Sequence, residues 1–255
     1  MIFKNNRSSI VNPKERNLYY KIFAGYYFNE LIRSSSINVR FEKFINIKPK
    51  ILIYKNNEGK IISGSEKTIK EILCIDLEDE FFTSFDNHLL LNKKNKKVTE
   101  EPGEYCDIAV WTKEKLIAIE AKYTENWDYK NDVKGNIEGL TELVNPEKDV
   151  YNPKVNNVLF LLCILDSKYK NALKRKDSQL RKLIESIDAS KQKKFDLSKL
   201  LRDCQISIGV ITWEQVLNSI KEFDDSKLVN EYFISSIEEM KKQKRISKTA
   251  TYLEI

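Results

Sequence analysis

Histidine is almost absent from this chain of 255 residues, in which only His88 is found. Chemistry that needs two or more histidines within the chain, such as that of zinc hydrolases with clustered histidine ligands, is therefore excluded. A Ser-His-Asp or Cys-His enzyme would have to use His88 itself. His88 lies in the segment FDNHLLLN, at the start of an expected strand, and we interpret it as a structural or surface residue.

Glycine and cysteine are also sparse. The seven glycines form neither a Walker-type phosphate loop nor a GxGxxG dinucleotide motif. The four cysteines are far apart and form no CxxC pair, which argues against a disulfide framework or a zinc ribbon and favours a reducing compartment. No stretch approaches 18 uninterrupted apolar residues, and the first residues lack a signal-peptide core. We therefore expect a cytoplasmic protein without a membrane segment.

The composition supports a folded domain with a basic surface. Hydrophobic residues make up 41% of the chain, enough for a sizeable core, and the length suits one large domain or a domain with an added subdomain. The 44 lysines and arginines outnumber the 38 acids, so the net charge is +6. An excess of this size permits a polyanionic partner without establishing one.

Hydrophobic periodicity predicts an α/β (α+β) fold, a mixed sheet with helices on both faces. Thr212-Trp-Glu-Gln215 matches a capping box at a helix start. Helices are expected at residues 12–33, 66–85, 131–143, from Asp166 onward, 212–220 and 226–242. Strands are expected at 38–47, in a hairpin at 50–64, at 88–91, in a second hairpin at 104–127, and at 156–165 and 204–211.

The second hairpin, EYCDIAVWTKEKLIAIEAKYTENW, has charged residues within an apolar pattern. Because side chains alternate between the faces of a strand, the simplest register pairs Ala109 with Ala118 and Asp107 with Glu120. Side chains paired in this way have Cβ atoms about 4.5–5.5 Å apart. Lys122 lies diagonal to Asp107 on the same face, and the small alanines leave room there for a ligand.

Two facing carboxylates repel each other unless a proton, Lys122 or a cation lies between them. Mg²⁺ favours sites of one or two carboxylates that are completed by water and phosphate oxygens, and such an ion promotes phosphodiester hydrolysis. The alternative is structural: Lys122 forms an ion pair with Glu120 or Asp107 at a half-buried sheet edge. The alternation of residues alone leaves both interpretations open.

Asp107, followed after 12 residues by Glu120-Ala-Lys122 at the end of the strand IAIEAK, resembles the motif of the PD-(D/E)XK nuclease superfamily, which includes many restriction endonucleases. The surrounding elements are similar too, through the buried strand VLFLLCIL to ISIGVITWEQVL, so the resemblance covers roughly residues 66–220. It implies a restriction-endonuclease-like core in which Asp107 and Glu120 bind Mg²⁺, or Mn²⁺ as a substitute, and Lys122 assists the attacking water. Cys106 replaces the proline that precedes the aspartate in the family, a position without a chemical role.

Under this resemblance the chain divides into an N-terminal helix and β embellishment at residues 1–65, the nuclease core at 66–222, and a C-terminal helix with a basic tail at 223–255. Many members of the family add a further metal-binding acid from the helix before the first core strand. Glu78 is our candidate, with Glu71 and Glu80 as alternatives and Glu30 as a more remote choice.

Four lysines precede the hairpin in the segment LNKKNKKV. We expect this segment either to follow a phosphate backbone or to be a solvated loop. The lysines are Lys93, Lys94, Lys96 and Lys97.

The resemblance leads us to expect a metal-dependent endonuclease for double-stranded DNA in restriction or anti-phage defence, by analogy of fold. A two-fold DNA site would favour a homodimer. One alternative is a nuclease for branched or single-stranded DNA or RNA in repair or mobile-element biology. The other is a non-catalytic nucleic-acid-binding protein on the same scaffold, in which the acids and Lys122 form a salt bridge.

Overall fold

The structure is a computed structural model and describes most of the central part of the chain. The described segments are 35–56, 61–64, 66–76, 81–87, 106–112, 114–122, 136–147, 154–174 and 205–222, together with residues 23, 58, 227, 230, 231, 233–235 and 238.

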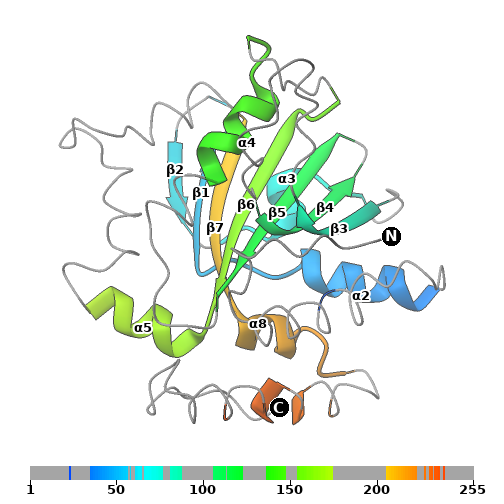
Figure 1. The fold of residues 1–255 in the computed structure, drawn as a ribbon, viewed down its shortest axis with the longest axis vertical. Coiled ribbons are helices and arrows are strands. Elements are labelled where there is room, and N and C mark those ends of the chain that lie inside the picture. Colours follow the sequence, from blue (N-terminus) through cyan, green and yellow to red (C-terminus); the bar gives the residue numbers. More distant parts are fainter. Residues whose placement is uncertain are drawn as a thin grey trace, which may run out of the picture.

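The described residues form one seven-stranded mixed sheet, with strand order β2-β1-β7-β6-β5-β4-β3 (Figure 1). The strands are β1 Ile51–Lys55, β2 Ile61–Gly64, β3 Phe81–Asn87, β4 Cys106–Thr112, β5 Lys115–Ala121, β6 Asn157–Ile164 and β7 Ile206–Thr212. The helices are α2 Ser35–Ile45, α3 Ile69–Leu73, α4 Asn136–Val144, α5 Asp166–Lys174 and α8 Trp213–Asn218.

Strands β3, β4 and β5 form an antiparallel meander. Strands β5, β6 and β7 are parallel, and α4 and α5 lie within the two connections, as parallel neighbours require. The hairpin of β1 and β2 joins the other side of the sheet, where β1 pairs antiparallel with β7. The carboxyl ends of β5, β6 and β7 therefore share one edge of the sheet.

The two faces of the sheet are covered by different helices. One core cluster joins α2, α3 and α8 to the face that carries Ile108, Ile117 and Ile119. The other joins α4 to the face that carries Ala109 and Ala118. These layers confirm the expected α/β class, a mixed sheet flanked by helices. No helix among the described residues is long and apolar enough to cross a bilayer.

The expected strand at 38–47 is wrong, because this segment lies largely in α2 Ser35–Ile45. Phe41, Phe44 and Ile45 are all buried, and their spacing of three and four residues places them on one side of a helix. The local run of β-branched and aromatic residues favoured a strand, but packing of this helical face against the sheet decided the structure.

The expected long helix at 66–85 is also wrong. Helix α3 spans only Ile69–Leu73 and ends at Cys74, whose φ of 50° is left-handed and cannot continue a helix. Residues 81–87 form strand β3, paired with β4. The strand expected at 88–91 and the helix expected at 12–33 lie outside the described residues, apart from Phe23.

Other expectations are confirmed. The hairpin at 50–64 and the buried strands near 156–165 and 204–211 are present as β1–β2, β6 and β7. Thr212 Oγ1 accepts from Gln215 N at 3.3 Å, and Thr212 N donates to Gln215 Oε1 at 3.0 Å, which is the expected capping box. Helix α4 begins at Asn136 within the described residues, inside the expected range of 131–143.

Gly209 allows β7 to lie close to its neighbours, and this makes a prediction about stability. A Cβ at Gly209 would lie 2.8 Å from Leu161 Cδ2 and 3.3 Å from Pro49 Cβ, whereas one at Gly64 would meet nothing within 4 Å. We expect Gly209→Ala to lower the free energy of unfolding by roughly 1–3 kcal/mol through overpacking. Gly64→Ala, the matched strand control, should change it by less than about 0.5 kcal/mol. Urea denaturation measures both, and equal stability of the two variants would contradict this packing.

Candidate functional site

The pairing of β4 with β5 sets the geometry of the predicted site. Ala109 pairs with Ala118, and Ile108 with Ile119, which confirms the predicted register. Asp107 and Glu120 are the next residues outward in this register, on the α4 face of the sheet. Both carboxylates are therefore presented at the carboxyl end of β5.

Asp107 is half-buried and is tied to the backbone of β5. Its Oδ2 accepts a hydrogen bond of 2.7 Å from the backbone N–H of Ala121, the residue that follows Glu120. This bond crosses the hairpin and fixes the Asp107 carboxylate beside the end of β5. Sequence alternation predicted the proximity of the two acids but not this backbone bond.

Glu120 is only 7% exposed. Its Oε1 lies 2.6 Å from Nζ of Lys122, and its Oε2 accepts 3.1 Å from Nδ2 of Asn136, the first residue of α4. Both carboxylate oxygens thus have a donor, which a buried carboxylate requires. The sequence did not predict Asn136 as a site residue, because it lies inside the helix expected at 131–143 and not at its start.

Lys122 is anchored through its backbone. Its N–H donates to the carbonyl of Cys163 on β6 at 2.8 Å. Its carbonyl accepts 3.3 Å from the indole Nε1 of Trp213, the first residue of α8. The backbone of Lys122 is thus held by β6 and α8 together, while its ammonium group pairs with Glu120.

The alanines beside the pair do not provide the space that we expected. Ala109 and Ala118 are fully buried and belong to the core cluster that includes Ile137 and Leu140 of α4. Core side chains fill that region, so a ligand would have to approach the carboxylates from the edge of the sheet.

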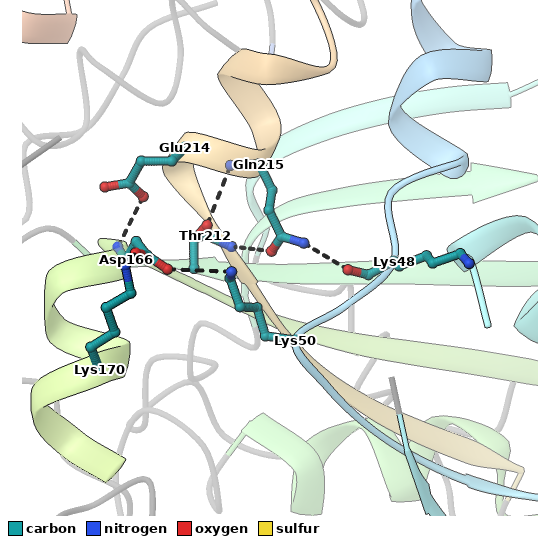
Figure 2. Close-up of polar contacts among 7 residues, drawn as sticks. All are labelled: Lys48, Lys50, Asp166, Lys170, Thr212, Glu214 and Gln215. Carbon is teal, nitrogen blue, oxygen red and sulfur yellow. Dashed lines mark hydrogen bonds and ion pairs between the residues drawn. The ribbon is translucent and has the colours of Figure 1, made fainter. Parts of the chain in front are cut away.

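A second charged group lies at the same edge of the sheet, after β6 and β7 (Figure 2). The backbone N–H of Asp166 donates to Glu214 Oε2 at 2.9 Å. The Asp166 carboxylate lies 3.4 Å from Nζ of Lys50 and 2.5 Å from Nζ of Lys170. From the sequence we expected only a helix that starts at Asp166, and we predicted no role for Glu214. Acids directly after two adjacent parallel strands were the signal, since such strand ends meet at one edge.

The two acids of this group differ in their proton affinity. Burial is the main cause that raises the pKa of Glu214 to about 7, and the charge of the nearby Asp166 contributes in the same direction. Burial would also raise the pKa of Asp166, but the ammonium groups of Lys170 and Lys50 hold it below its ordinary value. The pKa of the Cys163 thiol is raised well above normal, first by burial and then by the charges of Glu214 and Asp107. Cys163 therefore lies within electrostatic range of both acidic groups.

The structure brings Asp107, Glu120 and Lys122 together as predicted. Glu71 is engaged elsewhere, because its carboxylate accepts from Thr68 N at 2.6 Å in the cap of α3, and α3 packs on the opposite face of the sheet. The remaining candidates lie outside the described residues. They are Glu30, Glu78, Glu80, His88 and the lysines Lys93, Lys94, Lys96 and Lys97.

The donor set of the hairpin fits a hard cation. Asp107 and Glu120 supply two carboxylates from adjacent positions, and Mg²⁺ needs only one or two when water and substrate phosphate complete its coordination. Among the described residues no group of three or more His, Cys, Asp or Glu side chains is arranged to hold a metal. A cation at the hairpin would therefore depend on these two carboxylates within the described part of the chain.

Comparison with known proteins yields no family model, no curated protein and no solved structure that matches the chain.

The Glu120–Lys122 pair predicts a measurable coupling. In a double-mutant cycle of Glu120→Gln and Lys122→Met, we expect a coupling of roughly 1–3 kcal/mol in the free energy of unfolding, because each single change removes one charge of a pair in which Glu120 is buried and Lys122 half-buried. Lys43 and Glu222 are an exposed matched pair, also 2.6 Å apart, and their cycle should give no coupling above measurement error. Equal couplings in the two cycles would contradict the burial of the Glu120 pair.

Glu214 predicts a pH dependence of stability. A carboxyl whose pKa is raised from 4.5 to about 7 binds its proton more tightly in the folded state. The resulting stabilisation of about 3 kcal/mol is fully present below pH 4.5 and is lost as the pH rises to about 7. Relative to Glu214→Gln, the wild-type free energy of unfolding should therefore fall by this amount between those pH values. Parallel stability curves for the two proteins in urea denaturation would show that Glu214 titrates normally.

Proposed function

We propose that the chain is a Mg²⁺-dependent endonuclease with a restriction-endonuclease-like core, acting on double-stranded DNA. The observation that best supports this is the register of β4 and β5, which places Asp107 beside Glu120 with Lys122 next on the same face. The meander β3-β4-β5, followed by α4 and the parallel strand β6, also agrees with the order of elements that the resemblance implies.

Each residue of the hairpin has a proposed role. Asp107 and Glu120 bind the cation, which when bound polarises the phosphodiester and lowers the pKa of a coordinated water. Asn136 holds Glu120 Oε2, while Oε1 lies beside Lys122 Nζ. Lys122, which pairs with Glu120 in this structure, would use its ammonium group to orient the attacking water or to stabilise charge on the phosphate oxygens.

The charge of the chain is compatible with the choice of substrate. The net charge of +6 permits a polyanionic partner, and a homodimer would match a two-fold DNA site. A restriction or anti-phage role follows by analogy with the fold. Branched or single-stranded DNA and RNA are the alternative substrates, since the same three residues would serve them.

One observation favours a non-catalytic function instead. Lys122 Nζ lies 2.6 Å from Glu120 Oε1, so each of the two charges is neutralised by the other within the described structure. In this alternative the ion pair is permanent, it stabilises the sheet edge, and the protein binds nucleic acid without cleaving it.

Cleavage of a mixed substrate panel tests the proposal. Plasmid, linear duplex, branched DNA, single-stranded DNA and RNA would be incubated with Mg²⁺ or Mn²⁺ and with wild type, Asp107→Asn, Lys122→Ala or Lys43→Ala. We expect metal-dependent cutting of duplex DNA that falls about a hundredfold or more in the first two variants. Lys43→Ala should cut like wild type, because Lys43 lies on α2, where it pairs with Glu222, and α2 covers the face of the sheet opposite Asp107 and Glu120.

The other outcomes are equally informative. Cutting of a different substrate with the same loss in Asp107→Asn would favour the alternative nuclease function. Cutting that survives in both hairpin variants would refute the proposed site. Nucleic-acid binding without cutting by wild type would favour the non-catalytic function.

A further inference from the structure

The first turn of α8 connects the two charged groups at the edge of the sheet. Trp213 Nε1 donates to the carbonyl of Lys122 at 3.3 Å. The next residue, Glu214, accepts from the backbone N–H of Asp166 at 2.9 Å through Oε2 (Figure 2). Two successive residues of one helix are thus bonded to the residues that follow β5 and β6.

This turn is also fixed from the other side. Gln215 Nε2 donates to the carbonyl of Lys48 at 2.7 Å, and the capping box joins Gln215 to Thr212 (Figure 2). The indole of Trp213 is fully buried and packs against Phe23 and Phe233, with ring centroids 5.6 and 6.2 Å away. Because the indole is enclosed, it moves with the helix rather than independently of it. A displacement of the turn would therefore change the bond to Lys122.

Glu214 is the member of this turn that can respond to pH. Only 4% of it is exposed, and its Oε1 has no hydrogen-bond partner among the residues that the structure describes. The charged groups near it are Asp166 and Lys170 from α5 and Lys50 from the segment before β1, and the thiol of Cys163 on β6 is within electrostatic range. Both lysines already pair with Asp166. An ionised Glu214 would thus have an unsatisfied buried oxygen beside a second carboxylate.

We propose that Trp213 and Glu214 are positioning residues for Lys122, and that release of the Glu214 proton to solvent loosens the bond between the Trp213 indole and the Lys122 carbonyl. An ionised, buried carboxylate with a free oxygen must attract water or a lysine. Either response displaces the first turn of α8, and Trp213 moves with it. The consequence for catalysis rests on the proposed nuclease function, whereas the movement of Trp213 does not.

Fluorescence of Trp213 tests the movement directly. The full chain with Trp111→Phe and Trp127→Phe retains Trp213 as its single tryptophan. We expect its emission to titrate with a midpoint near pH 7 and to be flat from about pH 5 to pH 9 after Glu214→Gln. Asp166→Asn is the control, and it should shift the midpoint to lower pH because it removes the neighbouring charge.

Two fluorescence results would overturn the inference. One is an unchanged titration of Trp213 after Glu214→Gln. The other is no titration near pH 7 with Glu214 present, when circular dichroism shows that the chain stays folded.

Cleavage rates test the link to Lys122. If the duplex is cut, the ratio of the Glu214→Gln rate to the wild-type rate should be near one at about pH 6 and rise about tenfold by about pH 8, the scale of one hydrogen bond. Trp213→Phe keeps most of the packing but removes the indole donor, and it should lower the rate about tenfold at pH 6 with little change in KM.

A constant ratio of the two rates across this pH range, together with a titrating Trp213, would overturn the role of Glu214 in positioning Lys122. Absence of cleavage by wild type would reject the proposed function, while fluorescence still decides the movement of Trp213.

Discussion

The antiparallel register between β4 and β5 is the constraint on which the candidate site depends. A shift of one residue would move Asp107 to the face that packs against α2, α3 and α8, where its charge would be buried among isoleucines. The isoleucines on one face and the buried alanines on the other oppose such a shift. The bond from Ala121 N to the Asp107 carboxylate then fixes the acid beside Glu120.

The edge of the sheet combines two acid–lysine groups with different chemistry. In the hairpin group, Glu120 has a donor for each of its oxygens. In the group after β6 and β7, Glu214 Oε1 has no donor within the described part of the chain. Ion pairing and hydrogen bonding favour a charged carboxylate, whereas burial without donors favours a neutral one. Helix α8 contacts both groups through Trp213 and Glu214. A change in the charge of one group can therefore alter the position of the other.

Residue alternation and turn chemistry predicted the parts of the fold that depend on local pattern. The hairpin register followed from apolar alternation, and the α8 cap followed from Thr212 and Gln215. Residues 38–47 and 81–85 were misassigned because β-branched and aromatic residues suit both helix and strand until packing selects one. Asn136 and Glu214 were missed because their roles arise only when separate strand ends and helix starts meet. The position of Glu214 after a buried strand was a signal for this, whereas spacing within one element was not.

Binding of a divalent cation by the hairpin carboxylates is the most direct test of this account. Calorimetric titration of Mn²⁺ and Mg²⁺ would be run on wild type, Asp107→Asn and the surface control Lys43→Ala at one pH and ionic strength. The account predicts binding by wild type and Lys43→Ala that is lost in Asp107→Asn, since one carboxylate of the pair is then neutral. Equal binding by all three proteins, or no binding by wild type, would contradict a metal site in the hairpin and leave the Glu120–Lys122 ion pair as a structural feature.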